Sequence, residues 1–110
     1  MILKDMALGD IEFDADVFDS LYDDLLDVLR NNEVFIQFYK RDGSIRGMFC
    51  TRSVAYIEEH NTGKSRSTRT EEAILKDKFN RLVRVFDMKK NEFRSFKLDS
   101  VIAFEVLNEI

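Results

Sequence analysis

Four basic side chains in predicted strands of this 110-residue chain have the chemistry to bind a phosphate: Arg46, Arg84, Arg94 and Lys97. A guanidinium group meets two phosphate oxygens with parallel N–H donors, and an ammonium group acts as a point charge. In a hairpin of residues 80–87 and 92–97, we expect Arg84 to lie across from Arg94. Two opposed arginines repel one another unless an anion or an acid lies between them. The pattern therefore predicts either a bound phosphate or ion pairs with Glu92, Asp87 or Asp99. Lys97 is three residues from Arg94, so the two share a face only at a bulge or a strand end.

A second basic segment lies at residues 61–70, which are rich in Ser and Thr and contain no acidic and no apolar residue. Its cations are Lys64, Arg66 and Arg69. A segment that buries no apolar surface cannot offset the entropy lost on ordering, so we predict a mobile loop. Its charges either follow a nucleic acid backbone or are simply exposed to solvent.

The N-terminal third of the chain has the opposite charge. Residues 1–32 contain nine acidic and two basic residues, whereas the remainder contains 12 acidic and 15 basic residues. Four of the acids recur along one side of a helix predicted at 14–31, namely Asp16, Asp19, Asp23 and Asp27. This side is either a solvated face or a contact surface for a basic partner. Charge asymmetry of this kind concerns partners rather than fold.

The sequence has no catalytic constellation. It lacks a Gly-rich phosphate loop, a metal-ligand cluster and a histidine–carboxylate pair at useful spacing. Cys50 is the single cysteine and follows an apolar pair, which predicts a buried free thiol in a reducing compartment. We therefore expect a non-enzyme without catalytic residues, cofactor or metal.

No apolar run reaches the ~18 residues that span a bilayer, and no signal peptide is visible, so we expect a cytoplasmic protein without membrane association.

The elements that must position these side chains can be read from hydrophobic periodicity. Apolar residues at three- and four-residue spacing predict the helix at 14–31. Asp42-Gly43 is a strong hairpin-turn signal, and Gly47 suggests a bend or bulge. Residues 53–60 fit either a strand or a helical turn, and 71–78 fit a short helix. Strands rich in aromatic and β-branched residues are expected at 33–39, 45–51, 80–87, 92–97 and 101–107.

This order predicts one domain over residues 1–110, mainly β with an N-terminal α-helix. Residues 33–107 are expected to form a small SH3-like or Sm-like five-stranded antiparallel barrel with one end covered by the helix. Closure would remove the strand edges. Phe96 is expected to point inward beside Phe86 and Phe104, whereas Tyr39 and Phe93 are the best exposed candidates for stacking on a base.

Two segments carry a family resemblance: Phe38 to Arg46 in the first hairpin, and Val85 to Ile102 in the second. They resemble small, mostly bacteriophage-encoded proteins with an Sm-like SH3 barrel, related to WYL domains. The resemblance covers roughly residues 33–52 and 80–104. WYL domains are similar to regulatory sensors that bind nucleic acids or nucleotides through barrel arginines, which Arg94 and Lys97 match by position. The Trp-Tyr-Leu stretch that names those domains aligns here with Leu82–Phe86, which lacks the aromatic pair.

Two functions follow as expectations. The first is a small viral-type regulatory module that binds nucleic acid or a nucleotide through its basic barrel face. The second is a protein–protein effector that inhibits or redirects a host transcription or defence factor through its acidic helix. Both would act in the host cell cytoplasm, and the oligomeric state is left open.

Overall fold

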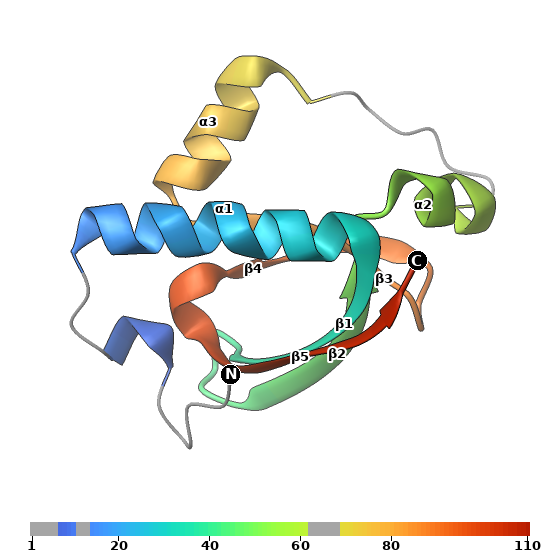
Figure 1. The fold of residues 1–110 in the computed structure, drawn as a ribbon. Helices are drawn as coiled ribbons and strands as arrows, with labels where there is room; N and C mark the ends of the chain where they lie inside the picture. The colour runs from blue at the N-terminus through green and yellow to red at the C-terminus, as the bar shows by residue number, and fades with distance from the viewer. Residues whose placement is uncertain (1–6, 11–13, 62–68) are drawn as a thin grey trace.

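The computed structural model describes residues 7–10, 14–61 and 69–110. The ten elements, shown in Figure 1, are η1 (Leu8–Asp10), α1 (Ala15–Asn31), β1 (Asn32–Tyr39), β2 (Ile45–Thr51), α2 (Val54–His60), α3 (Glu71–Phe79), β3 (Leu82–Asp87), β4 (Glu92–Lys97), η2 (Leu98–Ser100) and β5 (Val101–Glu109). The prediction of a mainly β chain with an N-terminal helix and five antiparallel strands is confirmed.

The five strands form one curved sheet in the order β4-β3-β2-β1-β5. The expectation of a closed barrel is wrong, because β4 and β5 are the two edges and do not pair with each other. The short η2 turn carries the chain from one edge to the other, where β5 pairs with β1. Figure 1 shows α1 lying across the open side of the sheet, and its apolar face packs into the core. Packing therefore replaces strand pairing at the gap.

Helix α1 begins where the sequence predicts. The side chain of Asp14 accepts a hydrogen bond from the backbone N–H of Val17 at 2.9 Å, which caps the first turn. The buried face is apolar and includes Phe18, Leu25 and Leu29, which join the core of the sheet. Tyr22 also lies on this face, and its hydroxyl donates to the carbonyl of Leu82 at 2.7 Å. The acidic side of the helix is left facing solvent.

The two ambiguous segments are both helical. Ser53 caps α2 by accepting from the N–H of Tyr56 at 3.3 Å, and Tyr56 packs edge-on against Phe86 on the outer face of β3. Thr70 caps α3 by accepting from the N–H of Ala73 at 3.1 Å. The expected short helix at 71–78 is thus confirmed. The expected mobile loop, with Lys64 and Arg66, falls almost wholly on 62–68, outside the described residues.

Gly47 has a packing role. The pairing of β1 with β2 is regular on both sides of Gly47, so the expected bulge is not there. The register shifts occur between β1 and β5. A Cβ atom at position 47 would lie 2.7 Å from Cζ of Phe35, whose ring packs against Phe49 at 4.9 Å between centroids. Glycine therefore makes room for the Phe35 ring on the outer face of the sheet.

Candidate anion-binding pocket

A cavity of about 650 Å³ opens on the inner side of the curved sheet, between the β1–β2 turn and strand β4. This volume is within the usual range of small-molecule sites. The basic residues that line it are Lys40, Arg41, Arg46, Arg94 and Lys97, and no acidic side chain lines it. The charged side chains of the lining are therefore all positive.

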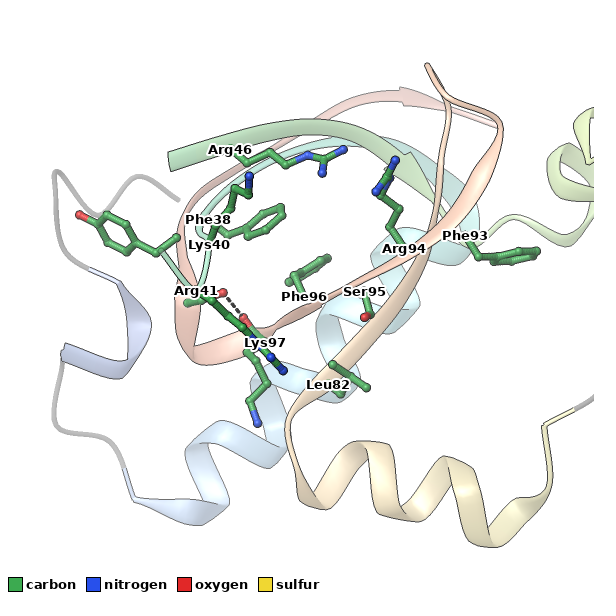
Figure 2. A pocket seen from close by; sticks show the side chains of 12 residues that line it. Phe38, Lys40, Arg41, Arg46, Leu82, Phe93, Arg94, Ser95, Phe96 and Lys97 are labelled. Atoms are coloured by element: carbon green, nitrogen blue, oxygen red, sulfur yellow. Dashed lines mark hydrogen bonds between the residues drawn. The ribbon is translucent and has the colours of Figure 1, made fainter. Parts of the chain in front are cut away.

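Strand alternation places Arg46 and Arg94 on the inner face. Arg46 pairs across the ladder with Phe38, and Arg94 pairs with Val85, which is buried. Figure 2 shows the two guanidinium groups pointing toward one another at one side of the cavity. Two strands that are not adjacent in the sheet, β2 and β4, thus supply one cationic pair.

The two arginines share the buried carboxylate of Asp87. Its Oδ2 lies 3.4 Å from Nη2 of Arg46 and 3.5 Å from Nε of Arg94. Its Oδ1 accepts hydrogen bonds from the backbone N–H groups of Lys89 and Lys90 at 3.0 and 3.1 Å. Asp87 therefore holds the β3–β4 turn with one oxygen and separates two like charges with the other.

The arginines keep binding capacity for a ligand. Charge-assisted N–H···O bonds are usually about 2.7–2.9 Å long, so the contacts to Asp87 are loose. Nε of Arg94 is buried and makes no hydrogen bond within the described part of the chain. A further contact joins Arg94 to Glu92, and the side chains of Arg46 and Arg94 remain 30% and 34% exposed. The solvent-accessible part of each guanidinium group is therefore what faces the cavity.

The apolar side of the cavity is a ring pair. Phe38 and Phe96 are stacked with 5.5 Å between centroids and 24° between planes. Phe96 points inward as expected, but its expected neighbour Phe86 lies on the opposite face. Phe86 instead meets Phe93 edge-on at 5.4 Å. Phe93 lines the edge of the cavity, and Figure 2 shows its ring directed away from Phe38 and Phe96.

Of the other predicted cations, Arg69 and Arg84 lie within the described residues, and neither lines the cavity. Arg84 pairs across the ladder with Ser95 and not with Arg94, so the expected opposition of two arginines is wrong by one residue. Arg69 and Arg84 both bind Asp77 of α3, at 2.7 and 3.0 Å. Arg84 therefore forms an ion pair, which is one of the two alternatives predicted for it. Its partner is Asp77 and not one of the three expected acids, Glu92, Asp87 or Asp99.

Lys40 and Arg41 were not anticipated as site residues. Both belong to the hairpin turn, and their place beside Lys97 depends on how the first hairpin curls toward β4. The only signal in the sequence is that both residues lie close to Arg46 in the same hairpin. This closeness does not show toward which face of the sheet the hairpin turn curves.

The acidic residues of the alternative hypothesis line the exposed side of α1. Asp16, Asp19, Asp23 and Asp27 are all exposed. Asp23 binds Nζ of Lys78 at 3.0 Å and Asp27 binds Arg30 at 2.8 Å. Asp16 and Asp19 have no ion pair with the residues that the structure describes.

Among the described residues, metal binding would need a cluster of ligating side chains, and nucleophilic chemistry would need a reactive thiol. No group of three or more His, Cys, Asp or Glu side chains there could hold a metal ion. Cys50 is a buried free thiol, as expected, and burial raises its pKa to about 12, with the charge of Asp87 acting in the same direction. A thiol with this pKa is a poor nucleophile near neutral pH.

No helix among the described residues is long and apolar enough to cross a membrane.

Residues 22–102 match the family model WYL_2, described as an Sm-like SH3 β-barrel fold. The chain belongs to the WYL_2 family. The match begins inside α1 and runs without a break through α2 and α3, so it is wider than the resemblance seen in the two hairpins. All five basic residues of the cavity lie within the WYL_2 match. No curated protein and no solved structure matches the chain.

Proposed function

We propose that this WYL_2 protein is a non-enzymatic regulatory module that binds a nucleotide or a nucleic acid segment, with the phosphates in the basic cavity. The observation that carries the proposal is that five basic residues, from the β1–β2 hairpin and β4, line one cavity without an acidic lining residue. The resemblance to mostly bacteriophage-encoded proteins supports a role in the cytoplasm of a host cell.

The cavity offers two kinds of contact. One phosphate would bind between Arg46 and Arg94, whose guanidinium groups face one another (Figure 2). Arg41 and Lys97 lie on the other side of the cavity, where they would meet a neighbouring phosphate or sugar. The stacked Phe38 and Phe96 rings between them give an apolar wall for a base or a ribose. Because the site is concave, an unpaired nucleotide would enter it more easily than a base-paired one.

Fluorescence anisotropy tests the proposal directly. The probes are fluorescein-labelled 12-nucleotide DNA and RNA, single-stranded and double-stranded, with AMP and ATP as competitors in about 50 mM salt. We expect single strands to bind best and the affinity to fall as salt rises, because bound phosphates release counterions. Binding weaker than ~0.1 mM for every probe would rule the proposal out, since even non-specific binders usually reach that range.

A matched pair of variants locates the site. Arg46→Gln/Lys97→Gln removes two charges from the cavity, and Arg30→Gln/Lys90→Gln removes two charges from exposed positions outside it. We expect the first variant to lose about tenfold or more in affinity, as two charge-assisted contacts disappear. The second should change affinity by less than about threefold, through long-range charge alone. Equal losses would show that binding is a diffuse effect of net charge.

The acidic side of α1 favours a second candidate, a protein–protein effector that inhibits or redirects a host transcription or defence factor. Its support is the row of exposed aspartates, of which Asp16 and Asp19 have no ion pair in the described structure. Reversing Asp19, Asp23 and Asp27 to Lys should abolish capture of a host protein from nuclease-treated lysate while the circular dichroism spectrum is kept. Capture that persists would exclude this face as the contact.

A further inference from the structure

Helix α3 carries the two most exposed large apolar side chains of the described structure, Phe79 and Leu75, and a third exposed one, Ile74. Phe79 is 87% exposed, Leu75 is 62% exposed and Ile74 is 52% exposed. No residue of α3 is buried. Figure 1 shows the helix rising away from α1 and from the sheet, in contact with the rest of the molecule near its C-terminal end. Leu75 and Phe79 are four residues apart and therefore share one face of the helix. Exposed apolar side chains that share a face mark an interaction surface rather than scattered exposure.

The helix is nevertheless held in a defined orientation. Asp77 binds both Arg69 and Arg84, and Arg84 belongs to β3. Lys78 binds Asp23 of α1 at 3.0 Å. An isolated nine-residue helix is unstable in water, so these contacts and the Thr70 cap are what order it. They direct Asp77 inward and leave Leu75 near the middle of the outward face.

The charges beside Leu75 are arranged so that the helix complements itself. With 3.6 residues per turn, Glu71 and Lys78 lie on one flank of Leu75, and Glu72 and Lys76 lie on the other. On each flank the acid is N-terminal to Leu75 and the base is C-terminal. In an antiparallel pair of such helices, the acids of one copy therefore lie opposite the bases of the other, on both flanks.

We propose that α3 is a homodimerisation helix, which packs antiparallel against α3 of a second copy across a two-fold axis near Leu75. A two-fold interface requires one surface that is complementary to itself. Leu75 would meet its own counterpart, and Phe79 would cover the N-terminal half of the partner helix. Glu72 would face Lys76 of the second copy, whereas Lys78 keeps its ion pair with Asp23 of its own chain and lies beside Glu71 of the second copy. This order of charges favours a second copy of the chain as the partner, because the same nine residues supply both sides of the interface.

The interface is small, which sets its expected strength. Two nine-residue helices bury less than the ~1,000 Å² typical of stable complexes, so the dimer should be weak and should depend on protein concentration. The basic cavity lies between the first hairpin and β4 and includes no α3 residue, so dimerisation would leave it open.

Sedimentation equilibrium between about 10 µM and about 1 mM protein tests the proposal. We expect the weight-average mass to rise from 13.0 kDa toward twice that value, and the variant Leu75→Lys to stay at the monomer mass throughout. Val54→Lys is the matched control, because Val54 is also an exposed apolar residue on a helix, at 54%, but lies on α2. It should associate as the wild type does. A wild type that remains monomeric at the highest concentration, or a Leu75→Lys protein that associates normally, overturns the proposal.

A charge exchange tests the antiparallel arrangement and distinguishes a second copy from a different partner. Glu72→Lys and Lys76→Glu should each fail to self-associate, because like charges then face each other, and neither change removes the contact between Lys78 and Asp23. Mixed in equal amounts, the two variants should associate again, and a mass tag on one of them should report a heterodimer. A mixture that remains monomeric, while circular dichroism shows both variants folded, contradicts the arrangement. Association of α3 with an unrelated protein in place of a second copy contradicts it as well.

Discussion

Nη2 of Arg46 lies 3.4 Å from Oδ2 of Asp87, a carboxylate that is almost fully buried. This contact crosses from β2 to the end of β3, and the same oxygen also lies near Arg94 of β4. One negative charge therefore partly neutralises the two guanidinium groups that face the cavity. Asp87 both holds the cavity together and competes with any anion that enters it.

Asp87→Asn should consequently strengthen anion binding while weakening the fold. The amide cannot neutralise the guanidinium groups, so the affinity for inorganic phosphate or AMP should rise about threefold or more. The free energy of unfolding should fall by about 1–3 kcal/mol, since a buried acceptor of charge-assisted bonds is lost. Isothermal titration calorimetry and urea denaturation measure the two effects.

Asp77→Asn is the matched control for that change. Asp77 also bridges two arginines, Arg69 and Arg84, but away from the cavity. Its variant should leave phosphate affinity unchanged. If both variants raise the affinity equally, the gain comes from net charge, and Asp87 is not a competitor within the site.

Phe96 and Phe93 differ only in the face of β4 from which they project. Phe96 is 3% exposed and stacks on Phe38, whereas Phe93 is 48% exposed on the outer side. Phe96→Ala should therefore lower the free energy of unfolding by about 3–5 kcal/mol through lost burial and a cavity. Phe93→Ala should cost about 1 kcal/mol, mainly its edge-on contact with Phe86. Similar losses in urea denaturation would contradict the face assignment.

Local signals in the sequence predict the elements well. Asp42 and Gly43 make the first hairpin turn as expected, with φ of 84° at Gly43 and the side chain of Asp42 accepting from the N–H of Ser44 at 2.9 Å. Periodicity likewise locates α1, whose apolar stripe is the buried one. These features depend on residues that are close together in the chain, so composition and spacing are enough to find them.

Register and closure depend on contacts that the sequence does not display. Asn91, with φ of 53°, closes a turn that pairs Asp87 with Glu92 and thus Arg84 with Ser95. A slip of one residue in this ladder changes the face of every side chain, which is why Arg84 was expected beside Arg94. Similarly, the place of Lys40 and Arg41 at the cavity depends on how the first hairpin curves toward β4. Sequence reasoning thus named Arg46, Arg94 and Lys97, which line the cavity, but not the turn residues beside them.

Burial of Cys50 predicts a loss of stability at alkaline pH. Burial raises the pKa of this thiol from an ordinary 9.0 to about 12 in the folded protein. Below pH 9 the thiol is neutral in both states, whereas above it the unfolded chain loses the proton and the folded protein does not. The free energy of unfolding should therefore fall as pH rises from about 9 toward about 12.

Cys50→Ala isolates this contribution. Tyr22 and Tyr56 have pKa values raised by burial as well, and both are present in the variant, so their effects cancel in the comparison. Urea denaturation between about pH 8 and about pH 10.5 should show a steeper decline for the wild type than for Cys50→Ala. Parallel declines would mean that the thiol reaches solvent, and a thiol reagent would then react with the folded protein.

Thr51 ties the C-terminal end of α1 to the sheet. Its hydroxyl donates toward the carbonyls of Leu29 and Asn32, at 3.0 and 2.9 Å, and accepts from the N–H of Ser53 at 3.0 Å. The residue is fully buried, so no water would replace these bonds. Thr51→Val keeps the shape but removes the acceptor of the Ser53 N–H and a donor to the Asn32 carbonyl, whereas the Leu29 carbonyl keeps the Arg52 N–H at 2.8 Å. The variant should cost about 1–3 kcal/mol in urea denaturation. Thr51→Ser keeps the hydroxyl and should recover most of that stability. If Val and Ser variants are equally stable, the methyl group rather than the hydroxyl network holds this junction.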